Sequence, residues 1–166
     1  MTIGNSRSII SLRIKLFAAT VLFIVYIVLA YFAKIIKFPF LGLSDNWVTF
    51  IMIVLYIAWL IYPMVLNYQY IWYSDEGDKI IVRYFVAGII GGKKNSIEIN
   101  KSHYAGYRSE KRFFGLIQSV ILFQHLKGGI AKYPPVYISL LGSEERKKLL
   151  WSLYQHAPAD AKEIRE

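Results

Sequence analysis

Residues 16–33 read LFAATVLFIVYIVLAYFA and residues 47–66 read WVTFIMIVLYIAWLIYPMVL, and neither stretch contains a charged residue. With Ile35 and Ile36 added, the first run amounts to about 20 residues, or about 30 Å of helix, which is enough to cross the hydrocarbon core of a bilayer. Neither run has the polar stripe of a helix that packs inside a soluble protein. The two runs therefore predict an N-terminal transmembrane hairpin with helices at about 16–36 and 47–66, within a membrane α+β protein.

The charges that flank the runs predict an orientation. Residues 1–15 hold three basic residues and no acid, whereas the connection between the runs holds two basic residues and one acid. By the positive-inside rule, both termini are expected in the cytoplasm, which makes the chain a multi-pass protein of the cytoplasmic (inner) membrane. The first run is too long for a cleaved signal peptide and no small-x-small site follows it, so it is expected to stay as an anchor. The charged residues are Arg7, Arg13 and Lys15, then Lys34, Lys37 and Asp45.

Aromatic residues gather near the ends of the second run. Tyr and Trp favour the headgroup zone of a bilayer because the ring is apolar and its tip is polar. The residues from Tyr68 to Tyr73 also have the composition of a strand, and both interpretations stay open because no linker follows the helix. The expected interfacial anchors are Trp47, Trp59, Tyr62, Tyr68 and Trp72.

Residues 67–157 change to the alternating pattern of a β domain. Short strands separated by turn residues predict six or seven antiparallel strands, with Glu110–Arg112 as a charged loop. The segment from His103 to Arg108 either continues the preceding strand or begins the next. A helix from Ser143 to Tyr154 is expected to close the sheet, since two acidic residues occupy its first turn. The expected strands are 68–73, 79–86, 97–100, 119–125 and 136–140, and residues 158–166 form a polar tail.

Composition argues against an enzyme. The chain has no cysteine, which excludes disulfides, thiolate metal sites and cysteine nucleophiles. His103, His125 and His156 lie far apart in the sequence and lack metalloprotease spacing, so neither a metal nor another cofactor is expected. The formal net charge of +9 suits nucleic acid or an anionic membrane. Next to two predicted spans, we expect the membrane and no nucleic acid.

The order of these elements resembles the small bacterial membrane proteins that carry a pleckstrin-homology-like domain. Their usual plan is two membrane helices followed by a strongly bent seven-stranded barrel that a C-terminal helix closes. The aromatic strand 68–73, the step Arg112-Phe-Phe-Gly-Leu116 into a hydrophobic strand, the turn 127–129 and the closing helix match by position. The proline-aliphatic segment that often precedes the family's central strand is replaced here by Ile97-Glu-Ile-Asn-Lys-Ser102. The resemblance implies a pleckstrin-homology-like β domain and no catalytic residues.

Two basic clusters are the candidate contact residues. One occupies a predicted turn at 91–95, and the other lies beside two phenylalanines. Basic residues next to aromatic ones suit an anionic bilayer, where each contributes about 1 kcal/mol. Solvated loops that follow the positive-inside bias are the alternative explanation. The candidates are Lys93, Lys94, Arg108, Lys111, Arg112, Phe113 and Phe114.

Three functional hypotheses follow. The first is a non-enzymatic module, held at the cytoplasmic membrane face, that assembles with another membrane protein or with itself through an open sheet edge. The second is direct binding of anionic lipid headgroups by the basic-aromatic turn. The third, an enzyme or a transporter subunit, would require a polar cluster such as His103, Glu98 and Tyr104 around a pocket.

Overall fold

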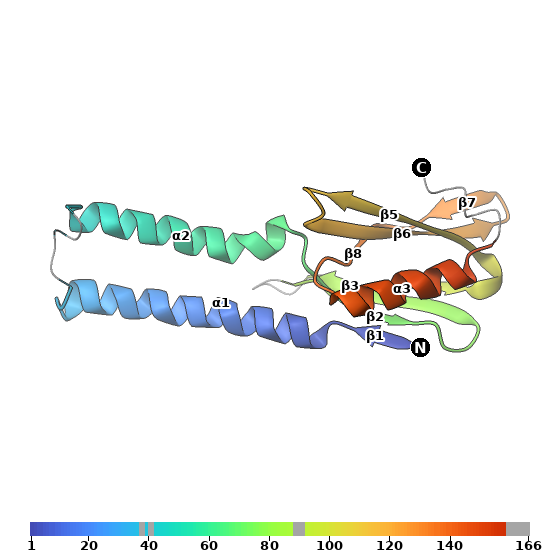
Figure 1. Cartoon of the computed structure of the whole chain (residues 1–166), viewed down its shortest axis with the longest axis horizontal. Helices are drawn as coiled ribbons and strands as arrows, with labels where there is room; N and C mark the ends of the chain where they lie inside the picture. Colours follow the sequence, from blue (N-terminus) through green and yellow to red (C-terminus); the bar gives the residue numbers. More distant parts are fainter. Residues whose placement is uncertain (37–38, 40–41, 88–91, 159–166) are drawn as a thin grey trace.

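The computed structural model describes residues 1–36, 39, 42–87 and 92–158. A long helical hairpin extends from one end of a β domain, and the N-terminus lies on the domain (Figure 1). The polar tail expected at 158–166 lies outside the described residues except for Pro158, as do Lys37 and Gly91.

The hairpin consists of α1 (Ser6–Ile27), which continues into a π-helical turn (Val28–Phe32), and of α2 (Asp45–Val65). Both helices are long and apolar enough to cross a membrane, with a mean hydropathy of 2.3 over the most apolar window of each. Their side chains are mostly exposed, so the hydropathy does not come from a soluble core. The prediction of two long apolar helices is confirmed, although the first begins ten residues earlier than the uncharged run.

Polar and aromatic contacts hold the two helices together. The hydroxyl of Tyr56 donates to Thr20 at 3.1 Å, and its ring stacks on Phe23 with a centroid distance of 4.4 Å. Further along, the hydroxyls of Tyr26 and Tyr31 lie 2.8 and 2.6 Å from that of Thr49. Hydrogen bonds of this kind are the ordinary means of joining helices in an apolar medium.

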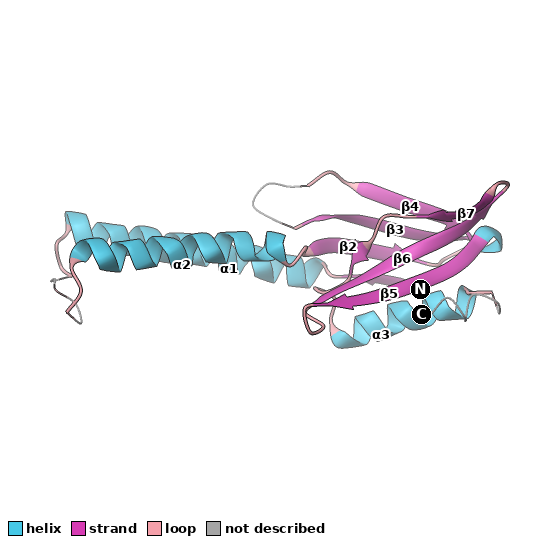
Figure 2. Cartoon of the chain, turned by 90° about the horizontal axis from the view of Figure 1, so that it is seen from above, coloured by secondary structure: helices cyan, strands magenta, loops and turns pink. Residues whose placement is uncertain are grey.

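The described strands form two four-stranded antiparallel sheets (Figure 2). The first has the order β1-β2-β3-β4, and the second has the order β5-β6-β7 with β8 paired to β6. The first sheet contains β1 (Thr2–Gly4), β2 (Gln69–Ser74), β3 (Lys79–Val86) and β4 (Asn95–Asn100). After a 3₁₀ turn (Lys101–His103), the second contains β5 (Tyr104–Arg112), β6 (Ile117–Leu126), β7 (Gly129–Lys132) and β8 (Val136–Tyr137).

One core joins both sheets to the C-terminal helix α3 (Ser143–His156). Alternate residues of β2, β3 and β4 point inward, as the period of two requires. Helix α3 contacts β1, at the edge of the first sheet, and β5, at the edge of the second, so it packs against an edge strand of each sheet. The antiparallel domain and its closing helix were predicted correctly. Fully buried members of the core include Ile71, Tyr73, Ile80, Ile99, Leu122, Ile138 and Leu153.

Three boundaries were wrong. Residues 1–15 are not one basic segment, because β1 adds a strand to the first sheet and α1 begins at Ser6. Glu110–Arg112 is the end of β5 rather than a loop, since it pairs with the start of β6. The last strand ends at Tyr137 instead of residue 140, because the chain turns there toward α3. The segment from residue 104 onward begins a new strand.

Candidate functional site: the hairpin-facing end of the β domain

The β domain has one end toward the hairpin and one end away from it. The turn between β5 and β6 lies at the end toward the hairpin in both views, and the β6–β7 turn lies at the opposite end (Figures 1 and 2). We call the first the hairpin-facing end. Since the strands run along the long axis, the loops at this end are displayed beside the point where α1 and α2 leave the domain.

The β5–β6 turn displays three apolar side chains. Phe113 and Leu116 are 69% and 64% exposed, and Phe114 is fully exposed. Phe113, Phe114 and Gly115 have φ angles of 49°, 54° and 87°, and such a conformation costs energy in residues other than glycine. Hydrogen bonds from the N–H groups of Gly115 and Leu116 to the carbonyls of Arg112 and Phe113 close the turn. The strained backbone therefore aims the two rings away from the domain.

The predicted basic residues do not form one cluster. Lys111 and Arg112 flank the turn, and Arg112 pairs with Glu110 at 3.1 Å. Arg108 is half-buried within β5, where its guanidinium lies 5.9 Å from the ring centroid of Phe123. Its assignment to the turn was wrong because β5 continues to Arg112. Lys93 and Lys94 are exposed in the segment that enters β4.

The predicted aromatic anchors occupy three different levels. Trp47 begins α2, and Trp59 and Tyr62 belong to its last two turns. Tyr68 packs edge-on against Tyr62, with a centroid distance of 5.5 Å, in the link to β2. Trp72 lies within β2, on the outer face of the first sheet, with the guanidinium of Arg83 at 5.0 Å.

Hydrogen bonds join the hairpin to the domain, and their main polar residue is Asn5. The Asn5 side chain donates to the carbonyl of Gln69 at 2.8 Å and accepts from the N–H of Ile71 at 2.9 Å. The Gln69 side chain in turn accepts from the N–H of Tyr137 at 2.9 Å. Asn5 thus ties the start of α1 to β2 and, through Gln69, to β8. An apolar cluster seals the same junction: Ile9, Leu12, Leu16 and Ala87, with Leu60, Tyr62, Tyr68, Tyr70 and Leu140 packed against it.

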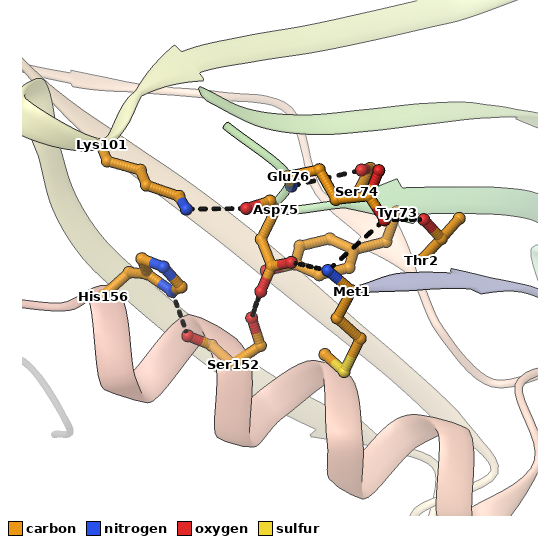
Figure 3. Close-up of polar contacts among 9 residues, drawn as sticks. All are labelled: Met1, Thr2, Tyr73, Ser74, Asp75, Glu76, Lys101, Ser152 and His156. Carbon is orange, nitrogen blue, oxygen red and sulfur yellow. Dashed lines mark hydrogen bonds and ion pairs between the residues drawn. The ribbon is translucent and has the colours of Figure 1, made fainter. Parts of the chain in front are cut away.

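At the domain's other end, a polar cluster fixes α3 to β2 (Figure 3). Ser152 donates to Asp75 at 2.5 Å, and its hydroxyl lies 2.7 Å from that of Tyr73. The α-amino group of Met1 contacts the other carboxylate oxygen of Asp75. His156 contacts the backbone carbonyl of Ser152 and not its hydroxyl, so the histidine is not placed to act as a base on this serine.

The charges of this cluster follow from its contacts. Burial alone would raise the pKa of Asp75, but the hydrogen bonds from Met1 and Ser152 and the nearby positive charges outweigh it, so the pKa lies below its ordinary value. Burial raises the pKa of Tyr73 to about 12, and the charge of Asp75 acts in the same direction. Ser152 and Tyr73 are buried, so the cluster is suited to holding α3 in place rather than to meeting a substrate.

The polar residues that would have indicated an enzyme are not brought together. Tyr104 is buried in the core, where burial raises its pKa, whereas His103 is exposed. Glu98 is exposed and pairs with Lys79 at 3.9 Å. Between the sheets lies a void of about 10 Å³, lined by apolar side chains. Such a volume holds at most about one water molecule, so this void offers no room for a substrate.

Sequence reasoning missed the residues of the junction. Asn5 and Gln69 are polar side chains whose burial follows only from the pairing of β1 with β2. The available signal was the β-branched pair Thr2-Ile3 before Gly4, which is too short to predict a strand. Comparison of the chain with known protein families, with curated proteins and with solved structures gives no match, so its function is inferred from its own residues.

Proposed function

We propose that this protein is a non-enzymatic membrane module whose hairpin crosses a bilayer and whose hairpin-facing end rests on the bilayer surface. The observation that carries the proposal is the β5–β6 turn, where Phe113, Phe114 and Leu116 are exposed beside Lys111. Exposed apolar groups of this kind mark interaction surfaces. These side chains lie at the end of the domain from which the hairpin leaves, so the bilayer would be the apolar partner nearest to them.

Dimensions and charges of the hairpin support this arrangement. The uncharged residues 16–32 of α1 and its π-helical turn extend about 25 Å, close to the roughly 30 Å of a hydrocarbon core. Lys15 and Lys34 bracket this stretch. The excess of basic residues before Leu16 places the β domain on the cytoplasmic side under the positive-inside rule.

The β domain supports the resemblance to the pleckstrin-homology-like membrane proteins. Strands β2–β8 are seven in number and form two antiparallel sheets around one core, and α3 covers one side between them. This corresponds to the expected plan of a bent seven-stranded barrel closed by a C-terminal helix. A similar fold does not establish a similar reaction, so the proposal rests on the exposed surface of the β domain and its contacts.

A series of single cysteines tests the bilayer contact, because the natural chain has no cysteine background. In proteoliposomes, a spin label on Phe114→Cys is expected to meet oxygen dissolved in the lipid, since the turn inserts. The same label on Lys127→Cys, in the β6–β7 turn at the opposite end, is expected to meet only the water-soluble relaxation agent. Ser44→Cys, between the helices, should react with an impermeant maleimide from the side opposite to Lys127→Cys.

Two results would count against the proposal in different ways. Equal exposure of positions 114 and 127 to the water-soluble agent would show that the β5–β6 turn does not contact the bilayer. Labelling of positions 44 and 127 from the same side would show that the hairpin does not cross the membrane.

A second candidate function is assembly with another membrane protein or with a second copy of this chain, and one feature favours it. β4 is the longest of the described edge strands other than β1 and β5, and it pairs only with β3 among the described strands. Asn95, Ser96 and Glu98 on it are exposed. An uncovered edge offers unpaired backbone groups to an added strand.

Photo-crosslinking in membranes tests this second candidate. A benzophenone amino acid at Ser96 is expected to give one defined adduct, whose mass is twice that of the chain for self-association and different for another protein. The same group at Glu76, which is exposed in the turn after β2 at the far end, is the control and should give none. Lack of a defined adduct at Ser96 would exclude β4 as the assembly edge.

A further inference from the structure

A groove of about 440 Å³ lies beside the junction of the hairpin and the β domain. Its volume is within the range of sites that hold small ligands. The first turns of α1 form one wall, Trp59 and Tyr62 of α2 form the other, and Leu140 closes the end at the domain.

The α1 wall of the groove is basic and polar. Arg7, Ser8, Ser11 and Lys15 all line it. At 100° per residue, the four positions fall within an arc of about 100°, so they occupy one face of the helix. The guanidinium, the ammonium and two hydroxyls are all hydrogen-bond donors, and none of the described residues that line the groove is acidic.

The two cations of the groove have no internal partner. Among the described residues, neither Arg7 nor Lys15 forms an ion pair, whereas Arg112, Lys79 and Lys147 do. Two unpaired cations on one helix face repel each other, and an anion between them removes that cost. Arginine and lysine with hydroxyl donors are a common donor set for phosphate.

The remaining lining of the groove is apolar and continues along the hairpin. Leu12, Trp59 and Leu140 line it next to the cations. Leu22, two turns beyond Lys15 on the same face of α1, is 69% exposed, and Leu55, one turn from Trp59 on α2, is 60% exposed. A ligand with an anionic head and an apolar tail could therefore follow the surface from the groove down the hairpin.

We propose that this groove binds the phosphate headgroup of an anionic phospholipid from the surrounding bilayer. The inference rests on the proposed membrane-spanning hairpin, which puts Lys15, the last charge before the apolar run, at headgroup level. Arg7 and Lys15 hold the phosphate, Ser8 and Ser11 donate to its oxygens or to the glycerol, and the acyl chains lie along Leu22 and Leu55. A free phosphate ion would leave the apolar part of the groove unused, which favours the lipid.

The test uses the full chain in nanodiscs that contain dioleoyl phosphatidylglycerol and dioleoyl phosphatidylcholine in equal amounts. After release in native mass spectrometry, one retained phosphatidylglycerol per chain is expected. Arg7→Gln and Lys15→Gln should each lower its occupancy about tenfold, because each removes a charge-assisted contact. Arg13→Gln is the matched control: it removes the same charge from the opposite face of α1 and should change occupancy less than twofold.

A steric variant makes the test independent of charge. Ser11→Phe fills the groove and is expected to abolish the retained lipid while leaving the thermal unfolding midpoint unchanged, since Ser11 is exposed. Equal lipid occupancy in the Arg7, Lys15 and Arg13 variants would overturn the proposed lipid site in the groove. Displacement of the lipid by millimolar inorganic phosphate would overturn it as well. These results would leave the proposed function standing, because that proposal is tested separately by the labelling of positions 44, 114 and 127.

Discussion

Replacing Asn5 with alanine is expected to lower the free energy of unfolding by about 3 kcal/mol, because two buried backbone groups of β2 lose their partner. The Asn5 side chain is 1% exposed and bonds to the carbonyl of Gln69 and the N–H of Ile71. A buried donor or acceptor left without a partner costs about 1–3 kcal/mol, and alanine leaves one of each. The loss would be measured by denaturant unfolding of the detergent-solubilised chain.

Asn95→Ala is the matched control for this substitution. Asn95 is exposed, and its side chain makes one hydrogen bond, a 3.3 Å contact to the carbonyl of Lys93. Its replacement should change the free energy of unfolding by no more than about 0.5 kcal/mol. Equal stabilities of the two variants would mean that Asn5 does not tie the hairpin to the domain.

The same residue shows where prediction from sequence stops. The apolar runs, the strands at 79–86 and 97–100 and the closing helix could be predicted because each has a periodicity of its own that extends over several residues. Asn5 has no such pattern. Its role depends on β1 lying against β2, which is 64 residues away from it in the sequence. Contacts at that separation are set by the whole fold and not by the neighbouring residues.

Charged segments were the other source of error. Glu110-Lys-Arg112 suggested a loop, but the segment ends the edge strand β5, where Lys111 and Arg112 are exposed, and edge strands commonly carry charges. The extension of β5 moves Arg108 away from the turn and leaves Phe113 and Phe114 as the tip. The loop predicted at Glu110–Arg112 therefore lies a few residues later in the structure, and its tip carries less charge than Arg108, Lys111 and Arg112 together suggested.

The sequence shows the residues that line the groove, but it does not indicate that they form a site. Arg7 and Lys15 were counted as flanking charges of an apolar run, and Ser8 and Ser11 carried no signal of their own. Their common face becomes evident only because α1 begins at Ser6, ten residues before the uncharged run. A helix that continues from the β domain into the apolar hairpin gives these four side chains a fixed spacing.

The position of α3 should depend on Ser152 nearly as strongly as the junction depends on Asn5. Ser152→Ala is expected to lower the free energy of unfolding by about 2–3 kcal/mol near neutral pH. The substitution leaves the buried hydroxyl of Tyr73 without a partner and removes one donor from the Asp75 carboxylate. Ser143→Ala, an exposed serine in the first turn of the same helix, is the control and should be nearly neutral.

The loss of unfolding free energy in Ser152→Ala should also depend on pH, and the contacts of Asp75 determine the direction of this dependence. The pKa of Asp75 is lowered by its contacts in the folded protein, so the carboxylate contributes stability above about pH 4, its range in an unfolded chain. That contribution is lost as the pH falls through the folded pKa. Because alanine removes one of the contacts that lower this pKa, the stability difference between the wild type and Ser152→Ala should shrink below pH 4. A difference that stays constant from pH 7 to pH 3 would show that Ser152 acts through Tyr73 and its packing and not through the carboxylate.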